Sequence, residues 1–166
     1  MKNHKRVRFE TTVGSAIEDV KSEVETLRDE IESWKDNLEG TGLENTGKYE
    51  QLEEAYDSLD AGSNALDSID LEESLKGSPV IEKKIIYFEF QAYGTSNACA
   101  KINSIMEALT ERGEEIEEAL NSLDDTDKGV IEYERLTDHK TAIEDIELEL
   151  QDALDNLKSV EFPGMY

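Results

Sequence analysis

The stretch that decides the fold is Val13–Leu38, which reads VGSAIEDVKSEVETLRDEIESWKDNL. Its apolar residues recur at steps of four and three, the heptad spacing of helices that pack along a seam. Thr11, Thr12 or Ser15 can cap the start, and the glycines between positions 39 and 47 end the helix in a turn. The pattern therefore predicts a long helix over residues 13–39. Its seam residues are Val13, Ile17, Val20, Val24, Leu27, Ile31, Trp34 and Leu38.

The same spacing resumes after the turn and predicts a second helix over residues 47–76. Because the turn is short, we expect these two helices to form an antiparallel hairpin. Leu136–Val160 repeats the pattern and predicts another long helix. We therefore expect an all-α protein of long antiparallel helices with heptad seams, arranged as two helical hairpins. The hairpins can close into one bundle, lie end to end or associate in a homodimer, and the pattern does not choose among these arrangements.

Residues 78–123 allow two interpretations. A heptad pattern from Ile81 to Leu123 favours a helix that starts at Ser78-Pro79 and has a kink near Gly94. The alternative is a short strand near 81–93, where β-branched and aromatic side chains are frequent. We take the helix as the main prediction. The predicted organisation is a basic N-terminal tail over 1–10, a first hairpin over 11–77, a second hairpin over 78–161 and a C-terminal tail over 162–166.

The chain is strongly acidic. Its 166 residues include 41 Asp and Glu against 17 Lys and Arg, so the formal net charge is 17 − 41 = −24. The first eight residues hold four of the cations and the first acid is Glu10, so the remainder carries 13 − 41 = −28. Nucleic acids and anionic membranes bind proteins through cations. We therefore expect no direct nucleic-acid binding and no membrane binding.

Several other classes of protein lack the residues they need. There is no apolar run long enough to span a membrane and no apolar segment of a secretory signal behind the basic start, so we expect a cytoplasmic protein. The single cysteine, Cys99, excludes an internal disulfide and a cysteine-based zinc site. Only His4 and His139 could serve a nucleophilic relay, and we expect His139 to pack on a helix seam. We therefore expect no enzyme activity and no cofactor.

The acidic turn at 124–129 has the alternating acids of a calcium-binding loop. With Gly129 at the sixth position of such a loop, Lys128 and Arg135 stand where oxygen ligands are needed. Neither an ammonium nor a guanidinium coordinates a cation, so we expect no metal site there.

The acids gather in clusters on the predicted helices. Residues 49–75 hold nine acids and no Lys or Arg. Like charges three or four residues apart destabilise a helix by a few tenths of a kcal/mol each, so an ordinary solvated helix gains nothing from lacking lysines. Two such helices side by side carry one charge per about 2.2 Å of axis, close to the roughly 1.7 Å of duplex DNA. The candidate partner-binding residues are Glu50, Glu53, Glu54, Asp57, Asp60, Glu114, Glu115, Glu117, Glu118, Asp124, Asp125 and Asp127.

In size, charge and the absence of a catalytic motif, the chain resembles the small acidic helical DNA-mimic and anti-defence proteins of phages and mobile elements. The resemblance implies an inhibitor that acts in the host cytoplasm on a cationic nucleic-acid-binding protein. The alternative is a structural or adaptor coiled coil, such as a virion or assembly component, with a solubilising acidic surface. For that alternative, Phe162, Met165 and Tyr166 form a candidate docking peptide.

Overall fold

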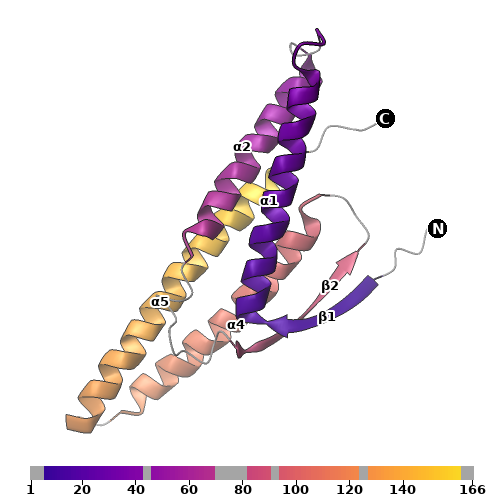
Figure 1. The fold of residues 1–166 in the computed structure, drawn as a ribbon. Coiled ribbons are helices and arrows are strands. Elements are labelled where there is room, and N and C mark those ends of the chain that lie inside the picture. The colour runs from indigo at the N-terminus through magenta and orange to yellow at the C-terminus, as the bar shows by residue number, and fades with distance from the viewer. Residues whose placement is uncertain (1–5, 43–45, 70–81, 91–93, 124–126, 162–166) are drawn as a thin grey trace.

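The computed structural model describes residues 6–42, 46–69, 82–90, 94–123 and 127–161. These residues form four α-helices and one two-stranded antiparallel sheet (Figure 1). The mostly helical fold predicted from the heptads is confirmed. The helices are α1 (Val13–Leu38), α2 (Gly47–Asp67), α4 (Ser96–Asn121) and α5 (Asp127–Lys158), and the strands are β1 (Arg6–Thr12) and β2 (Lys84–Phe90).

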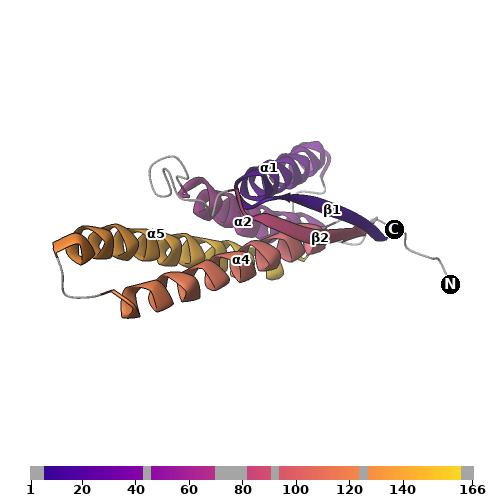
Figure 2. The same ribbon diagram turned by 90° about the horizontal axis from the view of Figure 1, so that it is seen from below.

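The helices form a bundle in the middle of an elongated molecule (Figures 1 and 2). Helix α1 packs against α2, α2 against α5, α5 against α4 and α4 against α1, so the four seams close around one core. The last turns of α1 and the first turns of α2 lie together at one end of the molecule, the α1–α2 end. The last turns of α4 and the first turns of α5 lie at the other, the α4–α5 end (Figure 1).

Six of the eight predicted seam residues of α1 are buried, and the other two, Trp34 and Leu38, are partly buried against the core. Val13, Ile17 and Ile31 are all fully buried, and each buried aliphatic side chain of this size contributes about 1.5–3 kcal/mol relative to exposure. On α2, a Cβ at Gly62 would lie 3.3 Å from Cδ2 of Leu157 on α5. The absence of a side chain at Gly62 therefore lets α2 and α5 pack closely.

Over Lys84–Phe90 the predicted helix is wrong, and the strand held as the alternative near 81–93 is present as β2. Exposure alternates along β2, since Ile85 and Tyr87 are buried while Ile86 is 47% exposed. This is the two-residue period of a strand. The apolar spacing was misleading because the buried Ile85 and the half-buried Phe88 of the strand also fall in the heptad register. The second predicted helix is α2, which ends at Asp67; residues 70–76 lie outside the described residues.

The basic tail expected over residues 1–10 is wrong from Arg6 onward, because these residues form β1. Strand β1 pairs antiparallel with β2, and Phe9 stands opposite Tyr87. Their rings stack with centroids 5.4 Å apart and an interplanar angle of 11°. The sheet therefore joins a segment before the first hairpin to a segment before the second.

Thr12 ends β1 and also caps α1. Its Oγ1 accepts a hydrogen bond from the Ser15 N–H at 3.2 Å, which satisfies one of the free donors of the first helical turn. Thr12 is one of the three caps considered from the sequence. Because α1 begins at Val13, no loop separates the strand from the helix.

A buried lysine links the sheet to the bundle through ion pairs. Lys101 of α4 is only 6% exposed, and its Nζ lies 2.8 Å from a carboxylate oxygen of Glu23 on α1 and 2.6 Å from one of Glu89 on β2. The same ammonium lies 5.3 Å from the ring centroid of Tyr87. Burial alone would lower the pKa of Lys101, but its hydrogen bonds to Glu23 and Glu89 outweigh burial and raise the pKa. Lys101 therefore stays charged and ties α1, β2 and α4 together.

Candidate acidic interaction surface

Helix α2 presents four of the predicted contact residues on one exposed face. The helix starts at Gly47, where the Oγ1 of Thr46 accepts the Tyr49 N–H at 3.4 Å, and it buries Leu52 and Leu59 on the opposite side. In the described part of the chain, none of the four carboxylates makes an ion pair with a Lys or Arg. The four residues are Glu50, Glu53, Glu54 and Asp57.

These four acids have a spacing close to that of phosphates. At about 1.5 Å of rise per residue they span about 10.5 Å of helix axis, or one charge per about 3.5 Å. One strand of duplex DNA carries a phosphate about every 3.4 Å. The exposed face of α2 therefore matches the linear charge density of a single nucleic-acid strand.

Helix α1 supplies a second acidic row that was not among the predicted contact residues. These acids recur at steps of four and three along α1 and its cap, and all are exposed. The heptad spacing of the acids was the signal that could have found them, because it places them along one side of the helix. The row consists of Glu25, Asp29, Glu32, Asp36 and Glu39.

Two tyrosines of α2 lie between the acidic rows. The hydroxyl of Tyr49 donates a hydrogen bond to Oε1 of Glu39 at 2.8 Å, and this bond is the main reason that the pKa of Tyr49 is raised to about 12. The pKa of Tyr56 is raised first by burial and then by the charges of Glu32 and Asp60. Both phenols therefore stay protonated at neutral pH, and acids from both helices converge on them.

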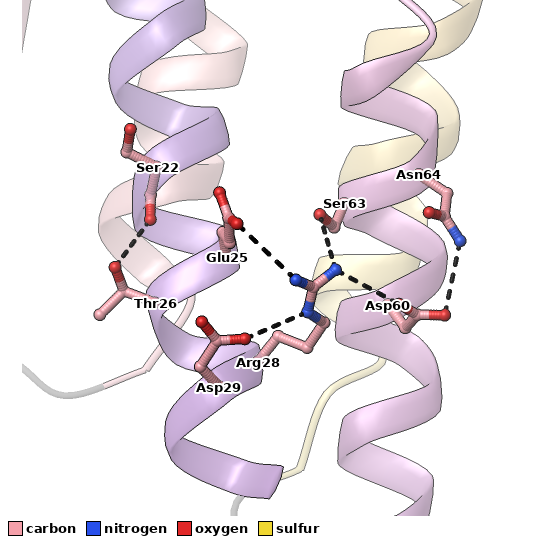
Figure 3. Close-up of polar contacts among 8 residues, drawn as sticks. All are labelled: Ser22, Glu25, Thr26, Arg28, Asp29, Asp60, Ser63 and Asn64. Carbon is pink, nitrogen blue, oxygen red and sulfur yellow. Dashed lines mark hydrogen bonds and ion pairs between the residues drawn. The ribbon is translucent and has the colours of Figure 1, made fainter.

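Two cations lie in the seam between the two rows. Figure 3 shows Arg28 reaching across from α1, with nitrogens 3.5 Å from Asp29 and 3.4 Å from Asp60 on α2. The Nζ of Lys35 lies 5.2 Å from the ring centroid of Tyr56 and 5.8 Å from that of Tyr49. Asp60, a predicted contact residue, is half-buried and engaged by Arg28, so it faces the seam.

The net charge of this end of the molecule is strongly negative even with these cations included. Residues 25–60 contain twelve acids and three bases, so their formal charge is 3 − 12 = −9. We call the outer carboxylates of the two rows the α1–α2 acidic surface. It consists of Asp29, Glu32, Asp36 and Glu39 of the α1 row and Glu50, Glu53, Glu54 and Asp57 of α2.

An open groove flanks this surface on the side of α5. It has a volume of about 500 Å³, and Glu54, Asp57 and Glu161 contribute carboxylates to its walls. Ser58 and Ser159 also line it, and the hydroxyl of Ser159 donates a hydrogen bond of 3.2 Å to that of Ser58. The groove is therefore suited to a cationic side chain of a partner.

The predicted contact residues on α4, together with Asp127 of α5, lie toward the α4–α5 end, far from α2 (Figure 1). The four acids on α4 are exposed, but Arg112 lies 3.0 Å from Glu115 and Lys140 lies 3.9 Å from Glu117. Asp127 is the first residue of α5, and Asp124 and Asp125 lie outside the described residues. The structure therefore does not bring the predicted set together in one site. The α4 acids are Glu114, Glu115, Glu117 and Glu118.

No protein-family model, curated protein or solved structure matches this chain. Among the residues described, no group of three or more His, Cys, Asp or Glu is placed to hold a metal ion. A membrane-spanning helix, which must be both long and apolar, is not found in the described part of the chain. The α1–α2 acidic surface is therefore interpreted from its own geometry.

Proposed function

We propose that the protein is an acidic helical inhibitor that occupies the cationic nucleic-acid-binding groove of another protein. The observation that carries the proposal is the exposed face of α2, where four carboxylates without a cationic partner among the described residues follow one another at about the spacing of DNA phosphates. The row on α1 adds charge beside it. The proposed partner is a cationic nucleic-acid-binding protein in the host cytoplasm, blocked in the manner of phage and mobile-element anti-defence proteins.

Carboxylates replace phosphates in this mechanism. Lys and Arg side chains that line a nucleic-acid groove would pair with the α1–α2 acidic surface, so the groove is no longer free for its substrate. The net charge of −24 steers a cationic partner toward the inhibitor and raises the association rate. Binding should weaken as salt is added, because the Debye length falls from about 10 Å at 0.1 M to about 3 Å at 1 M.

The packing behind the surface makes it suitable for such a role. Ile31 of α1 is fully buried and Leu52 of α2 is 1% exposed, so the backbone that carries the acids is fixed before binding. A rigid surface loses less conformational entropy on association than a flexible acidic tail does. Helical carboxylates on a packed hairpin therefore bind a fixed groove more tightly than the same charges on an unfolded segment.

A binding experiment with matched variants tests the proposal. The wild-type protein is immobilised and exposed to an extract of the organism that encodes it, and bound protein is eluted with duplex DNA. The α2 variant replaces Glu50, Glu53 and Glu54 by Gln and Asp57 by Asn. The control replaces Glu114, Glu115, Glu117 and Glu118 by Gln, so both variants have the same net charge.

We expect the wild type and the α4 control to retain a nucleic-acid-binding protein that duplex DNA releases. The α2 variant should retain at least about tenfold less of that protein, which corresponds to about 1.4 kcal/mol of binding free energy. Equal losses in both variants would show that only total charge matters. Capture that resists both salt and DNA would contradict the mimic.

One observation favours the alternative of a structural or adaptor protein. Helix α5 exposes three large apolar side chains, with Ile131 75%, Leu148 69% and Tyr133 53% exposed. Ile131→Ser and Leu148→Ser should abolish assembly if α5 packs against a scaffold component, whereas they should leave capture by the α1–α2 acidic surface unchanged. The candidate docking peptide at 162–166 lies outside the described residues.

A further inference from the structure

Strand β1 has an open edge. In the described part of the chain it pairs with β2 on one side, and the sheet contains no third strand. All of the residues from Val7 to Glu10 are exposed, with Val7 at 48% and Phe9 at 38%. An exposed strand edge is a template for pairing with another strand.

The positions of the hydrogen-bonded pairs between β1 and β2 show which backbone groups face that edge. The Val13 N–H donates to the Lys83 carbonyl at 2.9 Å, so these two residues form a hydrogen-bonded pair. Hydrogen-bonded and non-hydrogen-bonded pairs alternate along an antiparallel ladder. The pair of Thr12 with Lys84 is therefore non-hydrogen-bonded, and so are the pairs that Glu10 and Arg8 form with β2. The backbone N–H and C=O groups of Arg8 and Glu10 therefore point away from β2, into the open edge.

We propose that β1 pairs antiparallel with β1 of a second copy of the chain, with Phe9 opposite Phe9 on the twofold axis. The edge-facing residues must meet one another, and the registers that pair Arg8 and Glu10 among themselves are those centred on Arg8, Phe9 or Glu10. The first places Arg8 against Arg8 and the last Glu10 against Glu10. The register centred on Phe9 places each Arg8 opposite the Glu10 of the other copy, so it pairs unlike charges twice.

This register uses the groups that the edge presents. The pairs of Arg8 with Glu10 exchange two backbone hydrogen bonds each, so the dimer gains four N–H···O bonds across the axis. Phe9 then occupies a non-hydrogen-bonded pair, where opposing side chains are closest. Its ring already stacks on Tyr87, so the two copies would extend that aromatic contact across a four-stranded sheet.

Charge explains why this edge fits a second copy. The first eight residues carry four cations and no acid, whereas the remainder carries 13 − 41 = −28. Lys84 stands opposite the end of β1 and adds to the positive charge of the sheet. Two strongly acidic molecules therefore repel each other least when their sheets meet, and the acidic ends stay apart.

Sedimentation equilibrium over a range of protein concentrations tests the proposal at 0.15 M salt. Arg8→Glu and Glu10→Arg each place like charges opposite one another at two positions, so each should raise the dimer Kd about tenfold or more. The double variant Arg8→Glu/Glu10→Arg restores unlike pairs and should return to within about threefold of the wild type. Circular dichroism on each variant checks that the fold is intact.

The proposal is overturned if the wild type stays monomeric at every concentration, or if the dimer is indifferent to both single substitutions. A folded double variant that does not recover would also overturn it. A second measurement does not depend on charge. In a Cys99→Ser background, Phe9→Cys should form a covalent dimer on oxidation, because Cα atoms about 4.5 Å apart are within reach of a disulfide. Val7→Cys is the control, since each Val7 would face Thr11 of the other copy, and it should not cross-link.

Discussion

At Lys101, in the middle of the molecule, one buried ammonium meets the carboxylates of Glu23 and Glu89. At the α1–α2 end, the four acids on the exposed face of α2 make no ion pair within the described residues, and the nearby Arg28 and Lys35 lie in the seam between helices. The opposite charges at Lys101 compensate one another and hold α1, β2 and α4 together. The charges on the exposed face of α2 have no such compensation within the described residues, so they contribute little to the fold.

Substitution of Lys101 should have the largest effect on stability. Lys101→Met leaves Glu23 and Glu89 facing each other without a cation, and removing one partner of a buried pair costs about 3–5 kcal/mol. Because both glutamates keep about a quarter of their side-chain surface, with 26% and 27% exposed, we expect the lower part of that range. Urea unfolding followed by circular dichroism measures the loss. Adding Glu23→Gln and Glu89→Gln should recover most of it, and an unchanged single variant would contradict the role of Lys101.

Arg28 can be compared directly with Lys101, because it makes similar ion pairs although its side chain is less buried. Its side chain is 22% exposed against 8% for Lys101, so water screens its contacts with Asp29 and Asp60 more strongly. Arg28→Met should lower the free energy of unfolding by about 1 kcal/mol, the upper range for exposed ion pairs. The same urea titration tests this. A loss as large as that of Lys101→Met would contradict the distinction between the two regions.

Neutralising α2 should leave stability unchanged or raise it. The α2 variant removes five like-charge contacts three or four residues apart, including that of Asp57 with Asp60, each costing a few tenths of a kcal/mol. Loss of Glu50 from the first turn removes a favourable contact with the helix dipole, so we expect a net gain of about 0.5 kcal/mol. Thermal unfolding at low salt measures it, and the gain should shrink at 1 M salt. A clear loss of stability would show that these acids have a structural role.

The smallest effect concerns Tyr49, on the boundary between the acidic rows. Its pKa is raised from 10.0 to about 12, chiefly by the hydrogen bond that its hydroxyl donates to Glu39. That bond requires the protonated phenol, so its contribution to stability is complete below pH 10 and disappears as the pH rises through about 12. The difference between the phenolate absorbance titrations of the wild type and Tyr49→Phe isolates this group. A midpoint near 10 would show that the bond to Glu39 is absent in solution.

The helices were predictable because apolar spacing is a local property. The helix predicted over residues 13–39 agrees with the observed bounds of α1 to within one residue, and Thr12 was among the expected caps. The pairing of β1 with β2 was not predictable in the same way, since it joins segments far apart in the chain. The alternation of Val7, Phe9 and Thr11 was visible, but a strand over Arg6–Thr12 gains its stability only from β2 and the core beneath it.

The candidate surface was predicted only in part for a related reason. The exposed acids of α2 could be identified because no Lys or Arg lies among them. Which other acids join them depends on tertiary packing, and the structure brings the row on α1 to α2 while it places Glu114–Glu118 toward the opposite end. Sequence spacing within α1 indicated a common side of that helix, but not which neighbour it would lie beside.

The junction at Thr12 has a mechanical consequence. Because β1 passes into α1 without a loop and Lys101 links both α1 and β2 to α4, the sheet cannot turn independently of the bundle. Helix α1 has 26 residues, so at about 1.5 Å each it places its last turn about 39 Å from the end of the strand. The acidic carboxylates lie at that far end. The charged tip and the open edge of β1 are therefore kept apart by one stiff helix, so contacts made at one leave the other accessible.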